Sequence, residues 1–133
     1  MNTGCRSERM YLETDRLRVG YTDQKVTPWS GVVLLHNFSE RSGLLSAIKT
    51  WSLPMPGSNR GYAPNQMIEQ MLCSIWTGAG NYSQLDLTRL DPVLGKIFGW
   101  NKVAEHKAIE RFLNRFDQEK STEMMRNGLQ LVF

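Results

Sequence analysis

The chain has 133 residues, of which 41% are hydrophobic and 22% are charged, as in an ordinary globular protein and unlike a disordered tail. This length fits one small domain with a single core of modest size. The formal net charge of +3, from 16 basic and 13 acidic residues, is too small to indicate a class of partner unless the basic residues cluster on one face.

No apolar stretch approaches the roughly 18 to 20 residues that a membrane span needs, and residues 1–10 lack the apolar segment of a signal peptide. Cys5 lies in a polar segment and Cys73 in an apolar helix pattern, so a disulfide is not expected. These cysteines and two distant histidines give no metal-ligand spacing. We therefore expect a cytoplasmic chain with no membrane contact and no cofactor of its own.

The first predicted elements are a polar leader over residues 1–16 and a single short strand. The strand is indicated by the alternation of Leu17, Val19 and Tyr21 with polar or small residues. A helix is then expected from Thr27-Pro28 to about Gly43, because threonine caps helices and proline is tolerated in the first turn. The side chains expected to face inward from this helix are Val32, Leu35 and Phe38.

A second short helix is expected over 44–51, followed by a loop over 52–62 that is rich in proline and glycine. Pro64 begins a third helix, which glycines at 78 and 80 end. Apolar residues recur along it at three- and four-residue spacings, namely Met67, Ile68, Met71, Leu72, Ile75 and Trp76. Cys73 is expected to face this buried stripe as a small hydrophobic side chain.

The next predicted segment has Asn81 or Ser83 as its cap and takes its apolar contacts from Leu85, Leu87 and Leu90. Asp91-Pro92 then begins a short helix that Gly99 ends. The clearest pattern is at 104–116, where one face carries Ala104, Ala108, Ile109, Phe112, Leu113 and Phe116. A last helix is expected over about 118–131. The fold class is therefore mostly α, with residues 17–133 forming one small multi-helix domain.

Opposite the apolar stripe of 104–116, Lys107, Arg111 and Arg115 recur every four residues and so lie in one row. Asn114 flanks this row. Basic side chains suit phosphates or guanine edges, and amides suit adenine edges, so the row is a candidate DNA-binding surface. The alternative is an ordinary solvated face, because residues 101–126 hold six basic and five acidic side chains.

The loop 57–62 is a second candidate. Its glycines let backbone amides approach a phosphate, Asn59 and Arg60 add polar and charged groups, and Tyr62 can stack or donate a hydrogen bond. The alternative is a connector whose tyrosine fills a gap in the core.

No active site is expected. The carboxylate pair Asp86 and Asp91 lies in a helix-cap context, and Cys73 with His36 would form a nucleophile pair only through an unsupported tertiary coincidence. We therefore assign no catalytic residue and no metal ligand.

Three segments together resemble one family, the bacterial insertion-sequence transposases of the DDE class that carry a helical region before an RNase H-like core. The segments are Thr27-Pro-Trp-Ser-Gly31, Leu53-Pro-Met-Pro-Gly-Ser-Asn-Arg-Gly-Tyr-Ala-Pro64 and Glu110-Arg-Phe-Leu-Asn-Arg-Phe116. The resemblance runs from about Leu17 to the last residue.

The resemblance implies that the chain is an N-terminal region with a helix-turn-helix-like unit that binds the inverted-repeat ends of a transposon. It also implies that Mg²⁺ or Mn²⁺ chemistry belongs to a catalytic domain absent here, so the chain alone should be inactive. In the family a serine or threonine often begins the helix matching 104–116, whereas this chain has Val103 to His106, so the helix would rely on Glu105 near its positive end.

A second hypothesis stays open beside DNA binding. The near-balanced charge of the last third of the chain also suits a helical module for self-association, or a truncated transposase remnant, that makes no contact with DNA. A homodimer is compatible with either hypothesis.

Overall fold

The computed structural model describes residues 11–14, 17–20, 23–57 and 61–132 of the chain. Two short antiparallel strands come first, β1 (Tyr11–Thr14) and β2 (Leu17–Gly20), with Leu12 opposite Val19. The predicted strand corresponds to β2, and Tyr21 lies outside the described residues. The sequence did not predict β1, which falls within the segment assigned as a polar leader.

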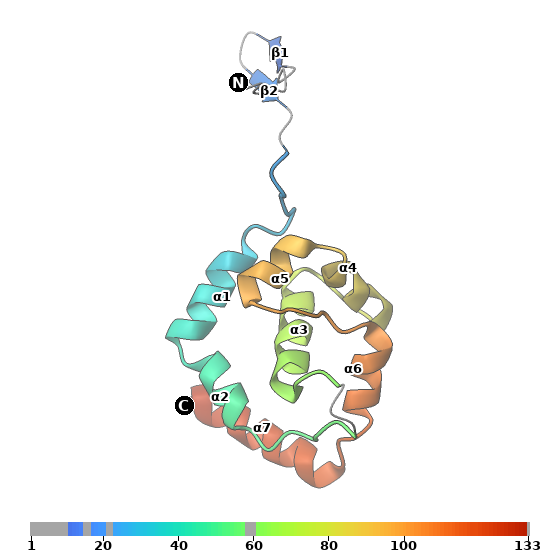
Figure 1. Cartoon of the computed structure of the whole chain (residues 1–133). Coiled ribbons are helices and arrows are strands. Elements are labelled where there is room, and N and C mark those ends of the chain that lie inside the picture. The colour runs from blue at the N-terminus through green and yellow to red at the C-terminus, as the bar shows by residue number, and fades with distance from the viewer. Residues whose placement is uncertain (1–10, 15–16, 21–22, 58–60, 133) are drawn as a thin grey trace, which may run out of the picture.

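The rest of the described chain is mostly helical, as predicted. Its helices are α1 (Val32–Arg41), α2 (Leu44–Thr50), α3 (Pro64–Trp76), α4 (Leu85–Arg89), α5 (Pro92–Phe98), α6 (His106–Leu113) and α7 (Gln118–Val132), with a 3-10 turn η1 (Tyr82–Gln84) before α4. Figure 1 shows α3 at the centre of a ring formed by the other helices. Helix α3 packs against α2, α4 and α6, while α1 packs against α2 and α5.

Several helix ends form where the sequence predicted them. The Asn81 side chain accepts a hydrogen bond from the Gln84 N–H, and Asp91 Oδ1 accepts one from the Val93 N–H at 2.8 Å. Gly99 ends α5 with φ of 72°, a left-handed conformation that glycine adopts without the steric cost of a Cβ. Helices α4 and α5 are joined by a tight turn, whereas an extended connection over 99–105 leads to α6.

The main core is built largely by α3 and α6. Ala104 and Ile109 are fully buried and Phe112 is 2% exposed, which confirms the apolar face predicted over 104–116, although the helix itself is shorter and Ala104 lies before its start. The Phe112 and Phe116 rings meet edge to face, with centroids 5.3 Å apart. Leu45, Ile48, Met67, Ile68 and Leu85 complete the buried cluster.

A second, aromatic core lies between α1, α3 and α5. Cys73 and Leu94 are fully buried there, and the Phe98 ring stacks on Trp100 with centroids 4.5 Å apart. The His36 and Phe98 rings meet edge to face, with centroids 4.6 Å apart. Burial, with a smaller contribution from the charge of Asp91, raises the pKa of the Cys73 thiol to about 12. Cys73 therefore stays protonated and acts as a small hydrophobic side chain, as predicted.

The predicted inner face of α1 is confirmed at Val32 but wrong at Leu35 and Phe38. Phe38 is 67% exposed and Leu35 is 39% exposed, whereas Val32 and Ser39 are buried. Ser39 can be buried because its hydroxyl donates to the Leu35 carbonyl at 2.8 Å, which satisfies the polar group within the helix. The face of α1 that packs against α2 and α5 therefore carries Val32 and Ser39. It does not coincide with the apolar stripe through Leu35 and Phe38.

Three other apolar side chains that were expected to make core contacts are exposed, namely Ile75, Leu87 and Leu90. Because α3 is surrounded by other helices, it buries polar residues as well as apolar ones. Gln70 and Ser74 are each 1% exposed, and Glu69 is 7% exposed. An apolar periodicity cannot reveal a helix whose polar side is also buried.

These buried polar groups hold neighbouring segments in place. The Gln70 amide donates to the Ala104 carbonyl at 3.2 Å and accepts from the Ala104 N–H at 3.0 Å. The Trp100 indole donates to the Glu69 carboxylate at 3.1 Å. The hydroxyls of Ser74 and Thr88 lie 3.2 Å apart and join α3 to α4. The connection 99–105 is thereby fixed along α3.

We expect Phe112→Ala to lower the free energy of unfolding by about 3 to 5 kcal/mol, because it removes a buried ring and leaves a cavity. A domain of this size has about 5 to 15 kcal/mol of stability in all. Phe38→Ala is the matched control and should move the urea midpoint little, because its ring is mostly exposed. Equal midpoints for Phe112→Ala and the parent would contradict the assignment of the core.

Candidate nucleic-acid interface

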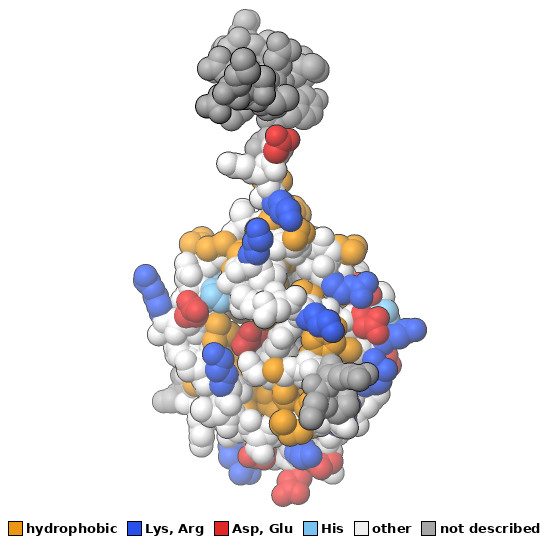
Figure 2. All heavy atoms as spheres, in the orientation of Figure 1, with side chains coloured by type: hydrophobic (Ala, Val, Ile, Leu, Met, Phe, Trp, Pro, Cys, Tyr) orange, Lys and Arg blue, Asp and Glu red, His pale blue; other side chains and the backbone are white. Residues whose placement is uncertain are grey.

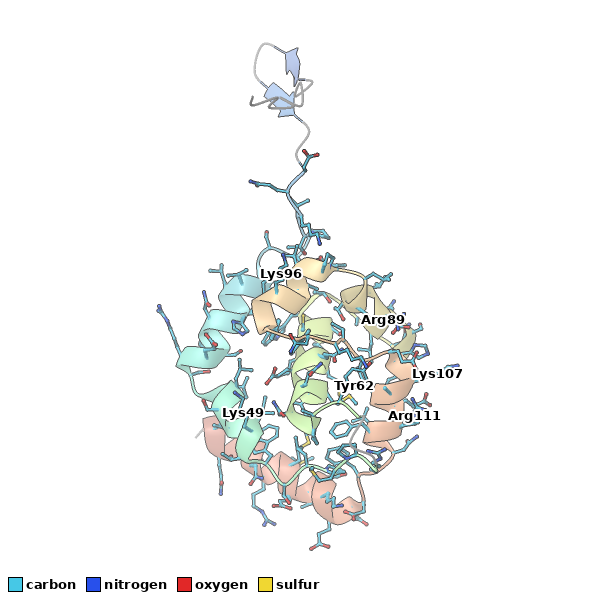
Figure 3. The ribbon with its side chains drawn as sticks, viewed as in Figure 1. Lys49, Tyr62, Arg89, Lys96, Lys107 and Arg111 are labelled. Atoms are coloured by element: carbon cyan, nitrogen blue, oxygen red, sulfur yellow. The ribbon has the colours of Figure 1, made fainter. Side chains whose placement is uncertain are left out.

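The predicted basic row lies on the outer side of α6. Lys107 and Arg111 are exposed on the helix, and Arg115 is exposed just beyond its end. Figure 3 shows Lys107 and Arg111 pointing away from the helical body. Asn114 is the C-cap residue, with its backbone N–H bonded to the Glu110 carbonyl at 3.0 Å and its side chain exposed. The buried Ile109 and Phe112 on the opposite face explain this orientation.

The start of α6 is capped by a residue from another helix. Asp86 of α4 accepts the His106 N–H on Oδ1 at 2.9 Å, and its Oδ2 lies 2.6 Å from His106 Nδ1. Glu105, expected to support this end, makes no capping hydrogen bond through its side chain. The carboxylate thus satisfies one of the free backbone donors at the positive end of the helix.

Burial of the Asp86 carboxyl acts to raise its pKa. The hydrogen bonds from the backbone N–H and the ring of His106, with the charges of His106 and Arg89, outweigh it and lower the pKa below its usual value. The ionised carboxylate is therefore favoured in the folded state.

The charges around the row are mixed. Glu105 lies 3.9 Å from both Arg89 and Arg111, between the two guanidinium groups. Figure 2 shows Lys and Arg side chains with Asp and Glu between them on the side where α4 and α6 lie. Exposed ion pairs at this distance contribute little stability. Lys107 makes no ion pair with any residue in the described part of the chain.

The second candidate, the loop between α2 and α3, is tied to the body through Tyr62. This half-buried ring packs against the main core, and its hydroxyl donates to the Val103 carbonyl at 3.5 Å. Tyr62 therefore behaves as the connector hypothesis expects and is poorly placed to stack on a base. Asn59 and Arg60, which were also predicted to contact DNA, lie outside the described residues.

The loop and the basic row meet at one shallow groove of about 370 Å³. Arg115 joins the two elements directly, because its Nη1 donates to the Met55 carbonyl at 3.3 Å. The groove is lined by Pro56, Gly57, Gly61, Tyr62, Met67, Ala108, Arg111, Phe112 and Arg115. The sequence indicated both elements separately, but nothing local in it could show that they adjoin.

The residues considered and rejected for chemistry have structural roles. Asp86 and Asp91 each cap a helix, Cys73 is enclosed in the aromatic core, and His36 packs on Phe98. Over the described ranges, no cluster of three or more His, Cys, Asp or Glu side chains could hold a metal ion. None of the helices in that part of the chain has the length and apolar character to cross a membrane.

The Asp86 cap makes a pH-dependent contribution to stability. Its folded pKa lies below the unfolded value of about 3.9, so the contribution is present above about pH 4 and is lost as the pH falls through the folded pKa. Asp86→Asn keeps an acceptor oxygen but removes the charge. We expect its deficit in unfolding free energy, measured in urea, to be largest near pH 5 and to shrink toward pH 2. A deficit that stays constant over this range would contradict the assignment.

Comparison with protein-family models, with curated proteins and with solved structures finds no match for this chain. The resemblance to transposases therefore remains a prediction from the sequence.

Proposed function

We propose that the chain binds double-stranded DNA through the outer side of α6 and the groove beside it, as the end-binding portion of a transposase. The observation that carries the proposal is the placement of Arg111 and Arg115 along one groove with the glycines Gly57 and Gly61. Two segments chosen independently from the sequence thus lie on one surface.

The chemistry of this surface suits a phosphate backbone. Arginine has five N–H donors, so Arg115 keeps donors for a phosphate after its single bond to Met55. The Arg111 side chain is 70% exposed and only weakly paired with Glu105, so exchanging that partner for a phosphate costs little. Lys107 adds a third cation and Asn114 an amide that can read a base edge.

In this proposal residues 1–133 supply recognition, and strand cleavage belongs to the catalytic domain that the family resemblance implies. Divalent cations would act in that domain, on its own carboxylates. The proposed site of action is the cytoplasm, where a transposase meets its element. Recognition of transposon ends rests on the family resemblance, whereas contact with phosphates rests on the groove.

The test is fluorescence anisotropy with a mixed-sequence DNA duplex over a series of salt concentrations. In Lys107→Ala/Arg111→Ala/Arg115→Ala we expect strongly weakened binding, with a slope of log affinity against log salt lower by roughly 2 to 3 units if each residue contacts a phosphate. The fold should remain, by circular dichroism, because all three side chains are exposed.

The matched control replaces three exposed cations elsewhere, Arg41, Lys49 and Lys96, with alanine. Lys49 and Lys96 lie on α2 and α5, well apart from Lys107 and Arg111 in Figure 3. This control should lose little affinity. If both triple variants bind like the parent, or weaken equally, the α6 row is an ordinary solvated face. Selection of bound sequences from a pool of random DNA duplexes would show whether the chain prefers one sequence. Recognition of transposon ends requires such a preference.

A second function, self-association without DNA contact, is favoured by a different observation. Large apolar side chains are exposed on two other helices, namely Leu34 and Phe38 on α1 and Met125 and Leu129 on α7. The absence of any duplex binding by the parent chain at low salt would leave this as the better hypothesis.

A further inference from the structure

Helix α7 has a broad apolar side that the described fold leaves largely uncovered. Met125 is 69% exposed, Leu129 is 55% exposed and Leu131 is 42% exposed. At 100° per residue these three side chains and Met124 fall within one half of the helix. Glu119, Glu123 and Arg126 occupy the other half. An amphipathic helix of this kind normally buries its apolar side against another element.

An apolar groove of about 570 Å³ separates this side of α7 from the helical body. Figure 1 shows α7 running along one side of the body, from near α6 to near α2. Among the residues that the structure describes, none with a charged side chain lines the groove. The lining residues are Trp51, Tyr82, Leu113, Phe116, Ser121, Met124, Met125 and Gly128. Tyr82 is 51% exposed at its edge.

The attachment of α7 to the body is slight. Of its described apolar side chains, only Met124 packs against the main core. An isolated helix of about 15 residues is marginal in water, so α7 would gain much from a partner that covers its apolar side. The groove and the exposed apolar residues of α7 therefore form one continuous apolar surface that the described fold does not cover.

We propose that a second copy of this chain completes this surface, with α7 of each copy lying across α7 of the other. In a two-fold interface the same patch of each copy contacts the other, so the patch must be complementary to itself. It therefore needs both protruding side chains and a groove that accepts them. Here Met125 and Leu129 project beside the groove that would receive the same residues of the partner. Because the groove lining is uncharged, two copies bring no like charges together. A charged ligand, nucleic acid included, would find no opposite charge there.

The exposed apolar area of the patch is large enough for the centre of such an interface. Large side chains have surfaces on the order of 200 Å². Four that are about half exposed, Tyr82, Met125, Leu129 and Leu131, therefore offer roughly 400 Å² per copy. A standard interface buries about 800 Å² on each partner. The patch can thus form the apolar centre of a dimer interface, with the half-buried groove residues adding to it.

The test is sedimentation equilibrium of the whole chain from low to high micromolar concentration. We expect the parent to dimerise and Gly128→Arg to weaken the dimer by roughly thirtyfold or more, because it puts a charge at the centre of the interface. A Cβ added at Gly128 would meet no atom within 4 Å in the monomer, and the substitution replaces a poor helix former, so the fold should remain. Leu129→Glu should weaken the dimer similarly.

Gln130→Arg is the matched control, since it adds the same charge to the opposite side of α7 and should leave the dimer intact. A parent chain that stays monomeric throughout would overturn the proposal. Equal effects of Gly128→Arg and Gln130→Arg would also overturn it. If Leu34→Glu/Phe38→Glu on α1 dissociates the dimer while Gly128→Arg does not, the interface lies on α1 and the assignment to α7 is wrong.

This inference does not depend on DNA binding. The Lys107→Ala/Arg111→Ala/Arg115→Ala variant should dimerise like the parent, because none of its replaced side chains lines the α7 groove. Loss of dimerisation in that variant would instead place the interface on α6.

Discussion

The two hydrogen bonds between the Gln70 side chain and the backbone of Ala104 are the interaction on which the rest of the structure depends. Both groups are buried, and the amide satisfies the N–H and the carbonyl of Ala104 together. Without this partner, each buried backbone group would cost about 1 to 3 kcal/mol. Gln66, which bonds both Gln70 and the Lys102 carbonyl, and Glu69, which accepts from Trp100, extend the same attachment along α3.

The position of the candidate interface follows from this attachment. With the connection 99–105 held on α3, α6 begins at His106, where the Asp86 carboxylate is in place to cap it. The helix then buries Ile109 and Phe112 in the main core and turns Lys107 and Arg111 outward. Tyr62 bonds to Val103 in the same connection, which brings the loop before α3 alongside α6. The groove between this loop and α6 therefore forms because both elements are attached to the connection 99–105.

Features set by neighbouring residues were predictable from the sequence. The apolar face of α6, the caps at Asn81 and Asp91, and the end of α5 at Gly99 each depend on a few adjacent positions, and all are confirmed. Because the row on α6 lies opposite that apolar face, its exposure was predictable too. The exposure of this row does not by itself show that its residues bind DNA.

Features set by distant residues could not be predicted in this way. The Asp86 cap joins positions twenty residues apart, and the Gln70 pair joins positions further apart still. The prediction that Phe38 faces inward from α1 was wrong because it rested on hydrophobicity alone, whereas Ser39 is buried with its hydroxyl bonded within the helix. The exposure of Met125, Leu129 and Leu131 on α7 could not be predicted either, because an apolar pattern does not show which element, if any, covers it.

A titration of the ¹⁵N-labelled chain with a DNA duplex, followed by nuclear magnetic resonance, would locate the binding surface directly. We expect the chemical-shift changes to concentrate on 106–115 and on the loop residues 55–57 and 61–62 beside them. Changes concentrated on α1 or α7, or no changes at low salt, would contradict a DNA-binding surface on α6.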